Sequence, residues 1–342
     1  MKKKSLLKSV EEAYKEGRRL VVPLMGFPGL QITGCNIKIA QQNYTEHFKV
    51  IKTLCSTFKP DAVFPLMDLC VEANALGKYT IFPKNESATV LNDTFNEDDL
   101  ILADSVNITS DTRMQGYSET MKLMTKELPG NILRGAYVTG PYTLSALMMG
   151  AEEAAVSTLL NPSELHKLCR ISAEKIKEYI CLMVESGAQL ICILEPSAVM
   201  LGPDQFKEFS ADYVSSIVKD YINTDVASIF HICGNSMHLI NIMSSVGVDA
   251  LSLDSPDTGV DLPGAAGMVP PNILIIGNLS PTGTLLFGSP DKVELKTTEL
   301  LRQMDKYSNF ILSTGCDIPQ ETPIENIQAF MRAGKNYRIN NE

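Results

Sequence analysis

Three residues with metal-binding chemistry lie at the ends of two apolar segments. His231 lies near the end of the apolar run 227–232, Cys233 directly follows this run, and Cys316 follows the run 310–314. If both runs are strands, alternate residues point to one side, so His231 and Cys233 can ligate one ion. An imidazole and two thiolates are ligands that zinc prefers, and a site with three protein ligands keeps a fourth position open for chemistry. The spacing therefore predicts a catalytic zinc ion, which would hold an entering thiol as the nucleophilic thiolate.

The alternative is that a His-x-Cys pair arises by chance and simply packs in the core. The chain has only four histidines, and Cys316 also stands at a strand end, which favours the metal site. His238 and Cys35 are possible alternative ligands. The remaining two histidines, His47 and His166, fall within helical patterns and are expected to be surface or packing residues. Four cysteines lie in apolar patterns and are expected in the core: Cys55, Cys169, Cys181 and Cys192.

The elements that would position these ligands are short apolar runs, each followed by a turn former and then a helical pattern. This is the pattern of parallel strands buried on both faces. Eight such runs predict a (β/α)8 barrel, in which chemistry is placed at the C-terminal ends of the strands. The runs are 20–25, 62–67, 133–138, 189–194, 227–232, 249–253, 273–277 and 310–314. Helical spacing between Asn161 and Gly187 predicts one long helix laid against the sheet.

The residues that follow these runs are unusually polar. In chain order they are Gly26 with Phe27, Asp68, Gly140 with Pro141 and Tyr142, Glu195, His231 with Cys233, Asp254, Asn278, and Cys316 with Asp317. Glu195 and Asp254 follow neighbouring strands. Each is a candidate for the fourth zinc ligand, or for orienting His231 through its other ring nitrogen. The alternative for both is a hydrogen-bonded acid at the rim.

The length and net charge of the chain limit the classes of partner that it can bind. The 342 residues are 44% hydrophobic and suit one barrel domain spanning residues 1–342, with an insertion, interpreted as a hairpin, at 77–111. A formal charge of -10 with dispersed Lys and Arg argues against a nucleic-acid partner. No apolar run reaches the roughly 18 residues that span a membrane, and the segment after Met1 is too short and polar for an export signal. These features predict a cytoplasmic protein.

Several of these segments resemble the uroporphyrinogen decarboxylase superfamily, and within it the methylcobamide:coenzyme M methyltransferase branch. The Gly-Pro segment at 140–144 is similar to that of the superfamily as a whole. The segments 230–235, 277–281 and 313–317 resemble the methyltransferase branch. In that branch, the residues matching His231, Cys233 and Cys316 bind zinc, and the thiol acceptor occupies the ion. The decarboxylase branch has an arginine-rich motif after its first strand, whereas this chain has Gly26-Phe27-Pro28-Gly29, which makes porphyrinogen decarboxylation improbable.

The resemblance also implies the partners. The methyl donor would be a methylated corrinoid on a small separate protein that docks over the barrel mouth, with 77–111 as part of the docking surface. The acceptor would be a thiol such as coenzyme M or homocysteine, although related bacterial proteins are also expected to use tetrahydrofolate. Asp68 would contact a substrate or the corrinoid edge, and Tyr142 and Asn278 would contact the corrinoid. Two alternatives stay open: a barrel that binds a corrinoid or tetrapyrrole without catalysis, and a decarboxylase-like enzyme without zinc chemistry.

Overall fold

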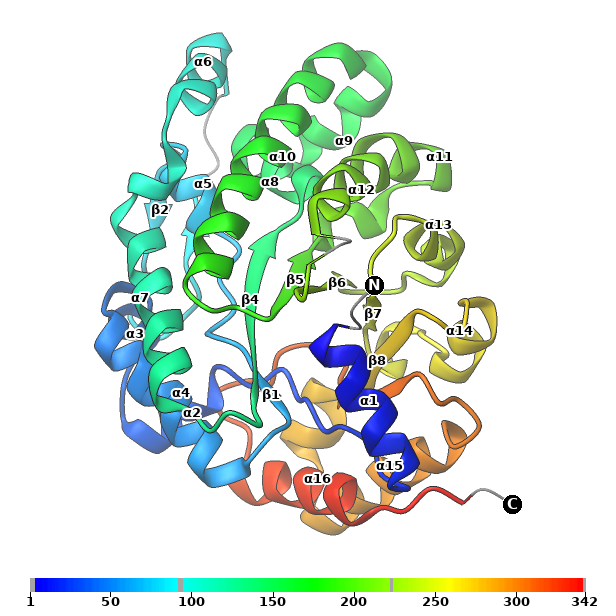
Figure 1. Ribbon diagram of the computed structural model, residues 1–342. Helices are drawn as coiled ribbons and strands as arrows, with labels where there is room; N and C mark the ends of the chain where they lie inside the picture. Colours follow the sequence, from blue (N-terminus) through cyan, green and yellow to red (C-terminus); the bar gives the residue numbers. More distant parts are fainter. Residues whose placement is uncertain (1–3, 92–94, 222–223, 341–342) are drawn as a thin grey trace.

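The computed structural model describes residues 4–91, 95–221 and 224–340, and its centre is a curled parallel sheet (Figure 1). Seven strands run in the order β1-β4-β5-β6-β7-β8-β9, and every neighbouring pair is parallel. The strands are β1 (Ala62–Val63), β4 (Leu133–Thr139), β5 (Leu190–Leu194), β6 (Ala227–Ile232), β7 (Ala250–Leu253), β8 (Leu274–Leu279) and β9 (Phe310–Thr314).

The segment around Val21 closes the sheet into a barrel. Val21 forms a parallel bridge with Leu312 of β9, and the N–H of Val22 donates to the carbonyl of Leu312 at 2.8 Å. On the other side, the N–H of Asp61, just before β1, donates to the carbonyl of Val21 at 3.1 Å. The first predicted strand therefore occupies the eighth position, and the predicted (β/α)8 barrel is confirmed.

The second predicted strand is shorter than expected. The run 62–67 pairs only as the two residues of β1, because Pro65 has no N–H to donate to a neighbouring strand. The next N–H, that of Leu66, donates to Nε2 of His47 at 2.9 Å instead. His47 is buried, and burial lowers its pKa to about 3, so it is a neutral packing residue, as expected.

Helices surround the barrel, and the first one covers its lower end. They are α1 (Ser5–Lys15), α2 (Pro28–Thr33), α3 (Ile37–Gln42), α4 (Tyr44–Phe58), α5 (Val71–Ala75), α6 (Glu97–Ser105), α7 (Thr112–Glu127), α8 (Pro141–Met149), α9 (Ala151–Leu160), α10 (Pro162–Glu185), α11 (Pro203–Phe206), α12 (Asp212–Val218), α13 (Ile240–Ser245), α14 (Leu262–Met268), α15 (Pro290–Gln303) and α16 (Ile324–Asn336). The long helix predicted after Asn161 is confirmed as α10. None of the described helices is long and apolar enough to span a membrane.

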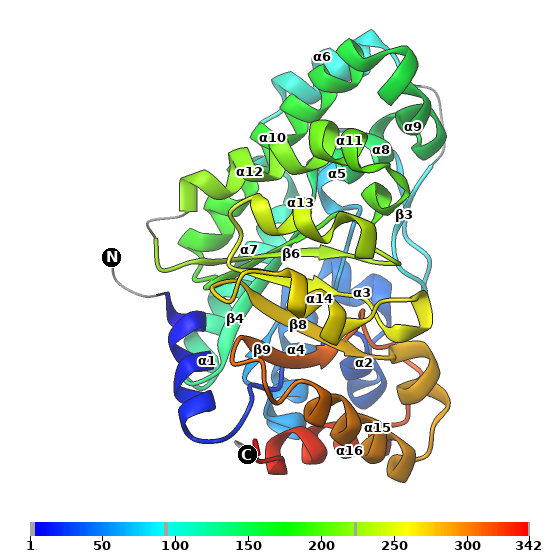
Figure 2. The same cartoon turned by 90° about the vertical axis from the view of Figure 1, so that its right-hand side faces the viewer.

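Strand alternation separates two apolar layers. One face of each strand packs against the helices, and the other fills the barrel interior. The interior cluster includes Leu6 and Val10 of α1, which lies across the end of the barrel where the strands begin (Figure 2). Lys4, just before α1, pairs with Asp249 at 2.8 Å at this end. The opposite, C-terminal end is left as the mouth.

The described residues of the segment 77–111 form a hairpin and a short helix. Strands β2 (Thr80–Ile81) and β3 (Thr89–Val90) pair antiparallel, and α6 follows them. Phe82, beside β2, lies under the guanidinium of Arg113 at 4.6 Å from the ring centroid, which ties the hairpin to α7. The hairpin reaches the mouth side of the barrel, where β3 is seen in Figure 2.

Candidate metal centre

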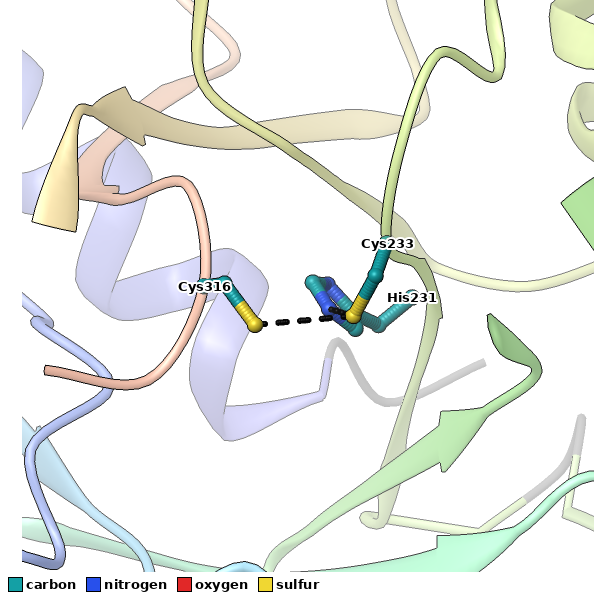
Figure 3. Close-up of side chains that lie close together, drawn as sticks. All are labelled: His231, Cys233 and Cys316. Atoms are coloured by element: carbon teal, nitrogen blue, oxygen red, sulfur yellow. Dashed lines mark hydrogen bonds between the residues drawn. The ribbon is translucent and has the colours of Figure 1, made fainter. Parts of the chain in front are cut away.

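His231, Cys233 and Cys316 converge at the mouth of the barrel, as Figure 3 shows. His231 points inward from β6, and Cys233 lies just after that strand. Cys316 approaches from the loop after β9. Nε2 of His231 lies 3.1 Å from Sγ of Cys233, whose sulfur is 3.5 Å from Sγ of Cys316. Within the described residues, these three form the single group of three or more His, Cys, Asp or Glu side chains whose ligand atoms all lie within 4.8 Å of one another.

The donor set fits a tetrahedral zinc ion. Bonds of about 2.3 Å to sulfur and about 2.0 Å to nitrogen place two ligand sulfurs about 3.8 Å apart and a sulfur and a nitrogen about 3.5 Å apart. The two sulfurs are 3.5 Å apart, and Nε2 of His231 is 3.1 Å from Sγ of Cys233, so both separations are a few tenths of an ångström shorter than these values. The donor types and the spacing of the three residues therefore fit a zinc ion.

The two thiols are coupled to each other and to the imidazole. The hydrogen bond from Cys233, and then His231, lower the pKa of Cys316, while burial opposes them. The same hydrogen bond and burial raise the pKa of Cys233. The hydrogen bond between the two thiols therefore favours a thiolate on Cys316. Thiolate is the form that ligates metal.

A glycine allows Cys316 to come this close to the other ligands. A Cβ at Gly315 would collide with the backbone nitrogen of Ser255, in the loop after β7. Only a residue without a side chain lets the β9 loop pack on the β7 loop and bring Cys316 beside Cys233.

His231 is oriented by Ser252, a residue that the sequence analysis missed. Nδ1 of His231 lies 3.0 Å from Oγ of Ser252, on the neighbouring strand β7, where the two residues are directly paired. With the proton on Nδ1 donated to this hydroxyl, Nε2 faces the thiols with its lone pair free for a metal. The register of the two strands would have predicted this contact, because His231 and Ser252 are paired and both side chains point into the barrel.

Asp254 holds the loop that carries Cys233. One carboxylate oxygen accepts from the N–H of Gly234 at 2.6 Å, and the other accepts from the N–H of Ser255 at 2.5 Å. The side chain in contact with Nδ1 of His231 is that of Ser252 and not that of Asp254. The structure thus places Asp254 as a positioning residue next to the cluster.

The backbone of Glu195 lies beside His231, whose carbonyl accepts from the N–H of Glu195 at 2.9 Å, but the carboxylate of Glu195 points to the start of α8. It is fully buried, and its carboxylate accepts from the N–H groups of Tyr142 and Thr143 at 2.9 Å and 2.7 Å, and from Oγ of Ser210 at 3.0 Å. Burial raises the pKa of Glu195, while these hydrogen bonds lower it. A Cβ at Gly140 would collide with the carboxylate, which explains why glycine precedes Pro141. Its three donors leave Glu195 poorly placed as a fourth ligand.

Asp68 is enclosed by its own partners. It is bonded to Arg113, accepts from the hydroxyl of Tyr117 at 3.0 Å, and accepts from the N–H of Cys70 at 3.0 Å. Arg113 and Tyr117 both lie on α7. The carboxylate therefore anchors α7 to the loop after β1, and its predicted contact with a substrate or corrinoid stays a prediction.

The two residues predicted to contact a corrinoid are buried. Tyr142 is 2% exposed and belongs to the outer apolar layer, and its contact with a corrinoid stays a prediction. Asn278 is 1% exposed, and its Nδ2 donates to the carbonyl of Asp254 at 2.8 Å. Asn278 thus links the loops after β7 and β8.

The alternative ligands lie elsewhere. Nε2 of His238 contacts the carbonyl of Leu201 at 3.2 Å, and Sγ of Cys35 contacts the carbonyl of Asn36 at 3.5 Å. Of the four cysteines expected in the core, Cys55, Cys169 and Cys192 are buried. Cys181 is exposed, because it lies on the outer side of α10 near Tyr221, so that expectation was wrong.

Sequence comparison assigns the family. The model of the uroporphyrinogen decarboxylase (URO-D) family matches residues 30–337, nearly the whole barrel. The chain belongs to the uroporphyrinogen decarboxylase family. Its resemblance to that family, read from the strand-end motifs, is confirmed.

Proteins with different activities are similar to this chain. A methylcobamide:CoM methyltransferase of Methanosarcina mazei is 33% identical over 216 residues, which cover 62% of this chain and 60% of that relative. A uroporphyrinogen decarboxylase of Prochlorococcus marinus is 26% identical over 287 residues, which cover 82% of this chain and 79% of that relative. A solved methyltransferase from Methanosarcina mazei has the same fold, with a TM-score of 0.87, 21% identity and coverage of 97% of both chains.

Proposed function

We propose that this protein is a zinc-dependent methyltransferase that moves a methyl group from a methylated corrinoid to a thiol acceptor. The observation that carries the proposal is the convergence of His231, Cys233 and Cys316 at the barrel mouth. The similarity to a methylcobamide:CoM methyltransferase supports it, although that match spans 60% of the relative. A zinc ion bound here would act as a Lewis acid that stabilises the acceptor as its thiolate.

The chain's own residues would prepare this site. Ser252 fixes the ring of His231, and Asp254 fixes the loop of Cys233. Three protein ligands leave one position open, which is typical of catalytic zinc. The carboxylate of Glu195 is held by three hydrogen-bond donors near α8, and that of Asp254 by two backbone N–H groups. Neither of these two predicted fourth ligands is therefore free to occupy the open position.

The methyl donor would be carried by a small corrinoid protein that docks over the mouth. The segment 77–111 lies on that side of the barrel and exposes several large apolar side chains, among them Tyr79 at 65% and Ile101 at 61%. Exposed apolar groups in one segment favour a protein interface. We propose this segment as part of the docking surface for the corrinoid protein.

Decarboxylation of a porphyrinogen is less well supported, despite the decarboxylases among the relatives. A substrate with several carboxylates needs cations at the mouth, and the segment Gly26-Phe27-Pro28-Gly29 after the first strand supplies none. A barrel that binds a corrinoid without catalysis would not need an open set of metal ligands.

The decisive experiment is thiol-dependent demethylation of methylcobalamin by zinc-loaded and metal-stripped protein. We expect about one zinc per chain, proton release when coenzyme M or homocysteine is added, and demethylation by the zinc form alone. The absorbance of the corrinoid reports methyl loss directly. Equal rates with and without metal would contradict the zinc mechanism, and no demethylation with any thiol would contradict methyl transfer.

Removing the hydroxyl of Ser252 tests how His231 is oriented. We expect Ser252→Ala to weaken zinc binding by about 10- to 100-fold, because the imidazole loses the partner that fixes its ring and tautomer. Competition with a chromophoric chelator measures the affinity. Ser172→Ala removes another buried hydroxyl, on α10, and should leave the affinity unchanged. Equal zinc affinity in both variants would contradict the role of Ser252 in orienting His231.

A further inference from the structure

A cavity of about 910 Å³ lies at the end of the barrel where the strands begin, opposite the mouth. Its walls are the C-terminal part of α4 with the turn 59–61 before β1, the end of α7 with the segment 128–132 before β4, and one side of α16. Helices α4 and α16 pack together at this lower end of the barrel (Figure 1). None of the candidate metal ligands lines the cavity. Its volume is typical of pockets that bind small molecules.

The floor of the cavity is apolar. Buried side chains from α4, from α16 and from the segment before β4 form it, and they are Cys55, Phe58, Leu128, Ile132 and Met331. A ligand with an apolar body would remove the facing surface of these side chains from water, which favours binding. The floor therefore selects for apolar surface on the ligand.

The rim of the cavity is charged, and cations are in excess among its described residues. The cations are Lys52, Lys59, Arg332 and Lys335, and the carboxylates are Asp61 and Glu127. Lys335 pairs with Asp61 at 2.8 Å, and Lys52 pairs with Glu127 at 3.2 Å, so both carboxylates already have a cation. Arg332 lies 3.8 Å from Glu294, which does not line the cavity. The positive charge that remains at the rim favours an anionic group on the ligand.

Lys59 has an uncommon backbone conformation. It caps the end of α4 with a φ of 50°, the single positive φ of a non-glycine residue in the described part of the chain. Glycine or asparagine usually takes this position, because a larger side chain is crowded in the left-handed region. No ion pair between described residues includes Lys59, although two carboxylates line the same cavity. A strained backbone that carries an unpaired cation into a cavity points to a ligand contact.

The cavity borders the seam at which the barrel closes. Asp61, in its wall, accepts from the N–H of Val21 at 2.7 Å through its carboxylate, and its carbonyl accepts from the N–H of Leu133 at 3.0 Å. The other carboxylate oxygen of Asp61 pairs with Lys335 of α16. A ligand bound by both Lys59 and Arg332 would join α16 to the turn before β1 across this seam.

We propose that this cavity is a binding site for an organic anion with an apolar body, whose charged group is bound by Lys59 and Arg332. The site is separate from the metal centre, and it depends neither on zinc nor on methyl transfer. The apolar body covers the floor, and the anionic group lies at the rim. Because the site exists only when the barrel is closed, binding stabilises the folded protein.

Two fluorescent probes with the same apolar body test the charge preference. They are 1-anilinonaphthalene-8-sulfonate and the neutral N-phenyl-1-naphthylamine. Fluorescence titration gives the ratio of the dissociation constant of the neutral probe to that of the sulfonate. Because the probes also differ in hydrophobicity, the ratio is compared between proteins. We expect Lys59→Gln and Arg332→Gln each to lower it about twofold to fivefold, and Lys122→Gln, an exposed change on α7 outside the cavity, to leave it unchanged.

Filling the cavity tests the place of binding. Ser56 lines the cavity from the exposed side of α4, and Ser56→Phe should weaken the binding of both probes about tenfold or more. Ser245→Phe on α13 is the matched control. Both serines are exposed near a helix end, and each hydroxyl donates to the carbonyl three residues earlier. We expect Ser245→Phe to leave both affinities unchanged.

Hydrogen exchange with and without the sulfonate shows where the probe binds. We expect slower exchange at the seam, in 19–22, 55–62 and 128–133, and no change at the mouth, in 231–235 and 313–317. An unchanged ratio in both charge variants, unchanged binding by Ser56→Phe, or protection confined to the mouth would overturn the inference. The measurements are made on metal-free protein, so the result does not depend on the proposed zinc chemistry.

Discussion

Replacing Cys316 with alanine is expected to abolish zinc binding and methyl transfer while the barrel stays folded. The side chain contributes one of three ligands and is partly exposed at the mouth, so its loss removes a metal bond and little apolar packing. Two remaining ligands cannot hold zinc firmly, and zinc content should fall from about one per chain to near zero. Metal analysis of the purified variant, with far-UV circular dichroism for the fold, measures both effects.

Cys35→Ala is the matched control for Cys316→Ala. Cys35 is also a partly exposed free cysteine, but its sulfur contacts the carbonyl of Asn36, far from the cluster in the sequence. We expect this variant to retain zinc and activity. The variants His231→Ala and Cys233→Ala should behave like Cys316→Ala. A folded Cys316→Ala protein with full zinc content would contradict the proposed metal site. Full activity in this variant would contradict the zinc mechanism.

Glu195→Ala is expected to lower the free energy of unfolding by about 3–5 kcal/mol. The substitution leaves two N–H groups at the start of α8 and the hydroxyl of Ser210 buried without an acceptor, and it opens a cavity in the core. Urea denaturation of the metal-free protein measures the loss without a contribution from zinc binding.

Glu174→Ala is the control for Glu195→Ala, because Glu174 is exposed on α10 and pairs with Lys177 at 3.5 Å on the surface. Its removal should change stability by less than about 0.5 kcal/mol. A loss below about 1 kcal/mol in Glu195→Ala would show that the buried carboxylate does not stabilise α8. Loss of zinc without a change in stability would support Glu195 as a metal ligand.

The strand pattern was readable from the sequence because buried parallel strands are continuous apolar runs. β6 and β9 have the predicted bounds, and β4, β5, β7 and β8 differ by at most two residues at an end. The runs around Val21 and Ala62 pair less than predicted. Pro65 ends one of them, and the other meets its neighbours chiefly through a single bridge. Apolar composition identifies a strand, but backbone donors decide how far it pairs.

The convergence of His231, Cys233 and Cys316 was also readable, because histidine and cysteine are rare in this chain and their spacing has a geometric meaning. The roles of the acids were not. Glu195, Asp254 and Asp68 all follow strands, yet each carboxylate is used by nearby N–H groups or side chains that the sequence does not place beside it. A carboxylate has the same appearance in a sequence whether it ligates a metal or holds a helix end.

By itself, the sequence determined the parallel barrel, the His231, Cys233 and Cys316 set, and the family, because strand periodicity and ligand chemistry are local properties of the chain. Only the tertiary structure decided which polar groups become neighbours. Ser252 beside His231, and Asp254 beside the N–H of Gly234, come from different strands and loops. Their roles depend on which donors and charges surround them after folding, and those distances join residues far apart in the sequence.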